Sequence, residues 1–246
     1  MPRLPFPIED GIEPVFSSRS LKFHYQDIQS HYCRKLNYLL EGTGHEMRRL
    51  EEIIVFYREY NVAPHIFNTA SMIYNHSFMW ICMSPYGEPP SAWMKNIINL
   101  NFGSMERFKL IWKMKCLQSF GCSWCWLVEN DGRLDIVVSA NAANPVGRAR
   151  LNPLLAMDLW EHAYMIDYGT DVERYVENWL RCINWQFVEA MLQKIEPHPN
   201  IVPHPWENVP GEESINVLTD PSPENVVAEA YQKEERDNEP DDIYPD

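Results

Sequence analysis

Four side chains in this sequence are of types that bind transition metals. Asp158 and His162 lie four residues apart, so their carboxylate and imidazole can converge on one ion, on a helix or where a strand leads into a turn. His24 and His76 lie in two further segments with helical character. Three imidazoles and one carboxylate suit iron, manganese or zinc. Spacing alone leaves a purely structural role open for each histidine.

The first half of the chain is predicted to be helical. An extended, proline-rich arm over residues 1–18 precedes it, and a Gly- and Pro-rich loop over 84–90 interrupts it. Apolar periodicity predicts helices over residues 20–40, 46–59, 65–80, 93–100 and 104–120. His24 therefore belongs to the first predicted helix and His76 to the third.

The second half changes character at residue 123. Aromatic and β-branched residues over 123–129 and 134–140 flank an Asn-Asp-Gly turn, which predicts a β-hairpin. A third strand is predicted over 154–158, and helices are predicted over about 172–194. This order predicts an α+β fold, with an N-terminal helical hairpin over residues 1–90 and a C-terminal α/β domain with a small antiparallel sheet over 91–195.

Residues 196–246 are predicted to form a proline-rich, acidic C-terminal extension. The 246-residue chain has a formal net charge of -14, and residues 207–246 hold 13 acidic and 2 basic residues. The rest of the chain is nearly neutral, so no basic excess favours nucleic-acid binding. One short helix fits 224–233, and alone such a segment should be disordered. We expect the extension to dock on a basic protein partner.

The six cysteines are irregularly spaced and follow no apolar secretory signal, which favours reduced thiols in an intracellular compartment. Cys122 and Cys125 form a CxxC that could serve zinc or redox chemistry. No second pair follows at zinc spacing, so small apolar side chains in a strand are the favoured interpretation. No run of 18 apolar residues occurs, so we expect no membrane contact.

Residues 158–164, DLWEHAY, resemble the DxWEHAY motif of the iron/manganese superoxide dismutases. Further resemblances follow in chain order from about residue 4 to 192. They comprise the segments LKFHY at 21–25 with Tyr32 behind it, FN at 67–68, YNHSF at 74–78, FGCSWCWLV at 120–128 and INW at 183–185. The motif at 158–164 is highly specific, and the extension has no counterpart in the family.

The resemblance implies a helical hairpin and an α/β domain with one metal ion between them. It implies His24, His76, Asp158 and His162 as ligands of one iron or manganese ion per chain, cycling between +3 and +2 while superoxide becomes oxygen and hydrogen peroxide. It also implies Tyr32 as a gateway residue. Residues matching other family positions are Trp80, Trp124 and Trp160 in an aromatic shell, and Glu161 and Tyr164 at a dimer interface. The segment 139–145 looks more like the iron type, and zinc stays open.

Three departures from the family pattern put activity in doubt. The glutamine or histidine that contacts the metal-bound solvent is replaced at both possible sites, by Met72 and by Ala142, unless Asn141 or a one-residue shift supplies an amide. In the family, a histidine four residues after the first ligand pairs with the partner subunit's tyrosine at the position of Tyr164. That histidine is replaced here by Ile28. Finally, FGSGW has become FGCSW, with Ser123 beside the site.

The four ligand positions are kept, whereas the groups that support them in the family are replaced. We expect this pattern where a metal is retained for folding, because a structural metal needs its ligands but not a tuned redox potential. By analogy with superoxide-dismutase-like proteins of mitochondrial ribosomes, we expect a structural subunit of the small ribosomal subunit in the mitochondrial matrix. It would form a homo- or heterodimer with a related chain through the Glu161/Tyr164 region, and its tail would bind ribosomal proteins. The alternative is an active iron superoxide dismutase.

Overall fold

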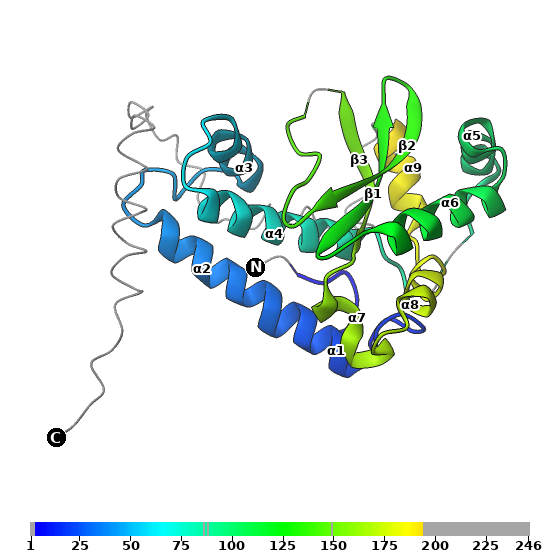
Figure 1. The fold of residues 1–246 in the computed structure, drawn as a ribbon, viewed down its shortest axis with the longest axis horizontal. Coiled ribbons are helices and arrows are strands. Elements are labelled where there is room, and N and C mark those ends of the chain that lie inside the picture. The colour runs from blue at the N-terminus through cyan, green and yellow to red at the C-terminus, as the bar shows by residue number, and fades with distance from the viewer. Residues whose placement is uncertain (1–2, 86, 88, 149, 194–246) are drawn as a thin grey trace.

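The structure, a computed structural model, describes residues 3–85, 87, 89–148 and 150–193. The C-terminal extension therefore lies outside the described residues. Figure 1 shows two long helical runs on one side of the molecule and a small sheet with its own helices on the other. The predicted α+β fold, a helical hairpin followed by an α/β domain with a small antiparallel sheet, is confirmed.

The helical hairpin begins after a short 3₁₀ turn at Ile8–Asp10. Its first arm is one continuous run made of α1 (Ser18–Lys22), a π-helical segment η2 (Phe23–Gln29) and α2 (Ser30–Leu40). The side chain of Ser17 caps α1 by accepting a hydrogen bond from the backbone of Ser20. The second arm is α4 (Pro64–Ile81), which follows α3 (Leu50–Glu59).

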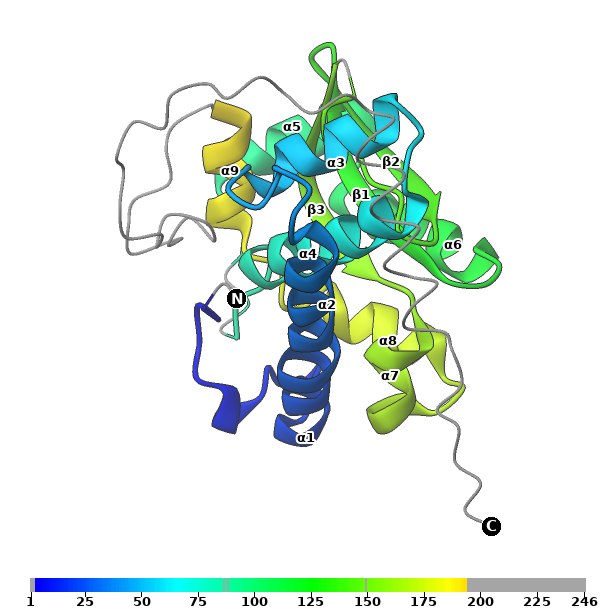
Figure 2. The ribbon, with the colours of Figure 1, turned by 90° about the vertical axis from the view of Figure 1, so that its left-hand side faces the viewer.

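Helix α4 is the buried axis of this half, because nearly all its side chains after Phe67 lie in the core. A helix that is apolar on most faces must be covered on most faces. Figures 1 and 2 show α2 running beside α4 and the sheet packed against the other side of α4. This arrangement places His24 and His76 on neighbouring helices.

The C-terminal half opens with α5 (Ala92–Phe102) and α6 (Met105–Gln118). The sheet follows, with strands β1 (Ser123–Asn130), β2 (Arg133–Ala140) and β3 (Leu151–Asp158) in the antiparallel order β2-β1-β3. The predicted turn joins β1 to β2, with positive φ at Asp131 (48°) and Gly132 (81°). The central strand β1 is almost wholly buried, and it pairs Trp124 with Asp158.

Three helices complete the domain: α7 (Glu161–Tyr168), α8 (Val172–Trp179) and α9 (Trp185–Gln193). The helices predicted over 172–194 are confirmed as α8 and α9, and the chain leaves the helical path between them, after Trp179. There the Ser84 amide donates to the Cys182 carbonyl (2.7 Å) and the Asn184 amide donates to the Cys82 carbonyl (2.8 Å). These bonds with a distant loop fix the place where α8 ends and α9 begins, which local periodicity does not show.

All six cysteines are free thiols. Cys125 is buried in β1, as the favoured interpretation of the CxxC expects, and Cys122 lies half-buried just before that strand. Within the described part of the chain, no helix is both long and apolar enough to cross a membrane.

Candidate metal centre

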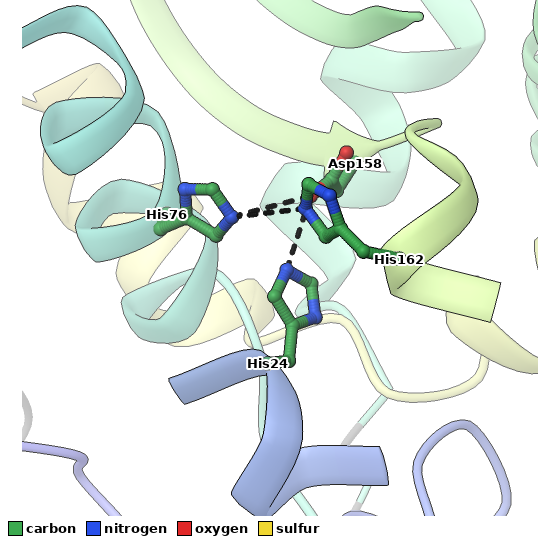
Figure 3. Close-up of side chains that lie close together, drawn as sticks. All are labelled: His24, His76, Asp158 and His162. Carbon is green, nitrogen blue, oxygen red and sulfur yellow. Dashed lines mark hydrogen bonds and ion pairs between the residues drawn. The ribbon is translucent and has the colours of Figure 1, made fainter. Parts of the chain in front are cut away.

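The four predicted ligands come together at one point between the two halves of the fold (Figure 3). His24 comes from the start of η2, His76 from α4, Asp158 from the last position of β3 and His162 from the first turn of α7. One nitrogen or oxygen from each residue lies within 4.8 Å of all the others. Residues distant in sequence thus form a single cluster of donor atoms.

The carboxylate of Asp158 is at the centre of this cluster. Its Oδ2 lies 3.0 Å from Nε2 of His162, 3.1 Å from Nε2 of His24 and 3.4 Å from Nε2 of His76. Nε2 of His76 and Nε2 of His162 face each other at 3.3 Å. Nδ1 of His76 donates to the Met72 carbonyl at 2.7 Å, which leaves the Nε2 lone pair directed into the cluster.

The electrostatics of the cluster favour the metal-binding protonation states. Burial lowers the pKa of His24, and it lowers the pKa of His76 to about 3, so both imidazoles are neutral. Burial alone would raise the pKa of Asp158, but His162 and His24 beside it hold that pKa below its usual range. Neutral imidazoles around a carboxylate fit iron or manganese.

Side chains outside the cluster fix the ligands. Oδ1 of Asp158 accepts from the Trp160 amide at 2.8 Å, and the Asp158 carbonyl accepts from the Tyr175 hydroxyl at 2.9 Å. Gln29 donates to Ser77 Oγ at 2.8 Å and accepts from Trp80 Nε1 at 2.7 Å, which ties η2 to α4.

Sequence reasoning missed Gln29 and Tyr175. Gln29 follows His24 by five residues, which is about one turn of a π-helix, and a π segment in that position could have revealed it. Tyr175 reaches the Asp158 backbone from a helix that begins fourteen residues later in the chain, and no local pattern signals such a contact.

Aromatic rings enclose the cluster, as the resemblance implied. The Trp80 ring lies edge-on to His24 with 4.9 Å between centroids, and the Trp124 ring lies edge-on to His76 at 5.1 Å. The Trp160 ring is 5.6 Å from the His162 ring. Trp80, Trp124 and the ligands His24 and His76 are buried, whereas Trp160 is only partly buried and the His162 side chain is 13% exposed, so the cluster is most open to water on the side of His162.

Tyr32, the predicted gateway residue, lies at the same cluster. Its ring is 6.0 Å from the ring of His76, centroid to centroid. Burial raises the pKa of its phenol, and the negative charge of Asp158 raises it further. The phenol is therefore protonated at neutral pH and can donate a hydrogen bond.

The positions that depart from the family pattern also lie here. Met72 is buried one helical turn before His76, and Ala142 is buried with its carbonyl accepting from Asn75 Nδ2 at 3.2 Å. Asn141 is exposed, and only its carbonyl contacts the site, by accepting from Trp160 Nε1 at 3.4 Å. The structure thus gives Asn141 no place as a substitute for the missing amide.

Trp124 Nε1 is a buried donor without a hydrogen-bond acceptor among the described residues. Its indole packs against His76, close to the helix that carries Met72. A glutamine carbonyl would be an acceptor of the kind this donor lacks, whereas a thioether is a weak one.

Comparison with known proteins agrees with this geometry. The alpha-hairpin domain of the iron/manganese superoxide dismutases matches residues 1–84, and their C-terminal domain matches residues 90–191. The iron superoxide dismutase of Entamoeba histolytica is 38% identical over 192 residues, which cover 78% of this chain and 98% of the relative. That of Coxiella burnetii is 40% identical over 190 residues, covering 76% and 95%.

The iron superoxide dismutase of Escherichia coli is 37% identical over 194 residues, covering 78% of this chain and 97% of the relative. The two domain matches together cover nearly all of the described fold. With a set of donors suited to a redox metal, they define the class of this protein as a metalloprotein. The chain belongs to the iron/manganese superoxide dismutase family.

Proposed function

We propose that this chain catalyses the dismutation of superoxide with one bound iron ion, in which two superoxide anions and two protons become one oxygen and one hydrogen peroxide. The converged donors of His24, His76, Asp158 and His162 carry the proposal. The relatives named as iron superoxide dismutases add to it, because 37–40% identity extends over nearly all of their length. A bound iron or manganese ion supplies the one-electron redox chemistry of the family.

The residues of this chain have three tasks in that reaction. The buried carboxylate of Asp158 and the three imidazoles would hold the cation, and the carboxylate would offset part of its positive charge. The tryptophan rings keep the site dry, which strengthens each electrostatic interaction inside it. The Tyr32 phenol holds a proton beside His76, where it can donate a hydrogen bond to a small anion.

Met72 and Ala142 make this site different from one with a buried amide. Neither side chain can form the hydrogen bond that tunes a proton at the ion. We therefore expect turnover roughly 10- to 100-fold below that of relatives that carry the amide, which is the usual effect of losing a group that supports metal ligands.

The decisive experiment measures iron content and dismutase rate on the purified full-length chain. We expect about one iron per chain and a dismutase rate proportional to iron content. His162→Gln should lose both iron and rate. Asp131→Asn changes an exposed carboxylate at the β1–β2 turn, at the end of β1 opposite to the Trp124–Asp158 pair, and it should lose neither. Stoichiometric iron without any turnover would sink the enzymatic proposal and leave a structural metal.

We also propose that the chain pairs with a superoxide-dismutase-like chain, identical or related, through α7. On that helix Glu161 is exposed, and Met165 and Ile166 are 47% and 37% exposed. Sedimentation equilibrium should give a mass of about twice the 29.0 kDa of one chain. The Ile166→Glu variant should sediment with the mass of a single chain. The ribosomal role, the ribosomal partners of the tail and the location in the mitochondrial matrix stay predictions from the sequence, because the names of the relatives refer only to superoxide dismutase.

A further inference from the structure

The outward face of α6 carries a row of exposed apolar side chains. Leu110, Met114 and Leu117 are 53%, 48% and 43% exposed, and their spacing of four and three residues puts them on one side of the helix. The inward face is already covered, since Trp112 stacks on Trp179 of α8 with 5.3 Å between ring centroids. Helix α6 is therefore apolar on two faces, and only one is covered within the described residues.

A hollow of about 460 Å³ adjoins this row where α6 meets α8. Figure 1 shows α8 beside α6 at the edge of the C-terminal domain. The hollow is lined by two leucines and by charged side chains from both elements, namely Glu106, Lys109, Leu110, Lys113, Glu177, Leu180 and Arg181. We call the hollow and the row of Leu110, Met114 and Leu117 the α6–α8 surface.

The hollow of this surface is lined by three basic and two acidic residues, a net charge of +1, whereas the chain as a whole is strongly acidic. Helix α6 carries four basic residues and one acidic residue, although the chain as a whole has a net charge of -14. Lys113 is already paired, since its Nζ lies 2.9 Å from Glu173 and 3.0 Å from Glu177. Arg107, Lys109 and Arg181 are exposed. An apolar row beside exposed cations favours an acidic, amphipathic ligand.

We infer that the α6–α8 surface binds the acidic C-terminal extension of this same chain, at residues 224–235. Four of the five apolar residues of that segment would share one side of the short helix that its sequence predicts, namely Val226, Val227, Ala230 and Tyr231. The charged residues of the segment are four glutamates and one lysine. The segment thus matches the surface in both apolar pattern and charge.

The length of the extension permits this contact. Helix α9 ends at Gln193, and the roughly 30 residues from there to Val226 can span about 100 Å when extended. A tether of this kind gives the segment an effective concentration in the millimolar range, so weak affinity suffices. The apolar contact must supply most of that affinity, because exposed ion pairs contribute about 0–1 kcal/mol each.

Zero-length carbodiimide cross-linking of the metal-loaded full-length chain tests the inference, because it joins a carboxylate to an amine only where the two are in contact. Mass spectrometry should find Lys109 joined to a glutamate of residues 224–235. A mixture of isotope-labelled and unlabelled chains should give links within one chain only. Links between labelled and unlabelled chains, or no link to Lys109, would overturn it.

Two matched pairs of variants separate docking from charge attraction. Val227→Asp with Tyr231→Asp makes the segment more acidic but less apolar, and it should lower the link at least fivefold, whereas Val217→Asp with Leu218→Asp should not. On the surface, Leu110→Gln should lower the link to a similar extent, and Leu100→Gln, at an 82% exposed position on α5, should not. A link that survives both docking variants would show that charge alone brings the extension to α6, which contradicts the inference.

Discussion

Met72 is the residue on which the chemistry of this site depends most. It stands one helical turn before His76, with its carbonyl accepting from His76 Nδ1 and its side chain buried. The main-chain atom therefore still orients the ligand, while the side chain brings no hydrogen-bond donor to the pocket. The main chain at position 72 therefore supports a predicted metal ligand, whereas the thioether side chain has no proton to donate.

Restoring an amide at this position should raise activity. We expect Met72→Gln to increase the dismutase rate per bound iron by about tenfold or more, because the amide can both donate into the pocket and accept from Trp124 Nε1. Met72→Leu keeps the volume without the amide and serves as the control, with an unchanged rate. Stopped-flow decay of superoxide measures both, and equal rates would contradict the assignment of this role to residue 72.

At the scale of elements, the N-terminal arm is fastened to α7 by Asp167 and by Tyr168, whose hydroxyl donates to the carbonyls of Pro14 and Val15. Asp167 accepts from the amide of Ser17 at 2.8 Å and from the hydroxyl of Ser17 at 2.6 Å. Ser17 is also the cap of α1, which leads directly into the segment that carries His24. A single carboxylate thereby joins the start of the first helix to the helix of His162.

Removing this carboxylate should destabilise the fold without touching the ligands. Asp167→Ala should lower the free energy of unfolding by about 1–2 kcal/mol, since two hydrogen bonds to a charged acceptor are lost. Asp131→Asn keeps a side chain that tolerates the left-handed backbone of the turn and removes the charge of the exposed pair with Arg150 at 3.1 Å, so it should cost less than about 1 kcal/mol. Urea unfolding of the two iron-loaded variants compares their stabilities. Equal midpoints would refute a stabilising role for the hydrogen bonds between Asp167 and Ser17.

Local sequence predicted most elements, because helical periodicity and the Asn-Asp-Gly turn act within a few residues. It failed where distant contacts decide the structure. Periodicity predicted helices over 172–194 but not where one ends and the next begins, which depends on backbone bonds to the loop at 82–84. For residues 161–168 the sequence left a helix and a turn after a strand both open. Within the candidate site, ligand positions could be predicted, whereas Gln29 and Tyr175 could not, because their partners come from other elements.

At the scale of the whole molecule, the metal site lies where both halves meet, so its occupancy should affect global stability. Removing the ion leaves the fully buried Asp158 carboxylate and three imidazoles without their shared partner. We expect the apo protein to melt about 5–10 °C below the iron-loaded one, for a difference of roughly 2–3 kcal/mol. Calorimetry of apo and reloaded samples measures this, and coincident transitions would exclude a stabilising metal.

Buried phenols should make the fold sensitive to alkali. Burial raises the pKa of Tyr57 to about 12 from an ordinary value of 10.0, and burial also raises the pKa of Tyr175. A raised pKa means that the folded state holds the proton more tightly. The associated stability is therefore complete below about pH 10 and is lost as the pH rises towards 12.

Denaturant unfolding followed between pH 9 and 12 should show this loss. Tyr57→Phe should flatten the pH dependence, because it removes one of the protons involved. Tyr60→Phe changes a 54% exposed tyrosine three residues away, and it should leave the slope as it is. A wild-type stability that stays constant over this range would contradict the effect of burial on these phenols.

The division of the donors along the chain affects when an ion can be captured. His24 and His76 are synthesised early, but Asp158 and His162 follow only after about two-thirds of the chain has been made. A nascent chain therefore has no complete set of donors until its C-terminal domain can fold. Full coordination of an ion by this chain is therefore a late event of its synthesis and folding, whichever ion is bound.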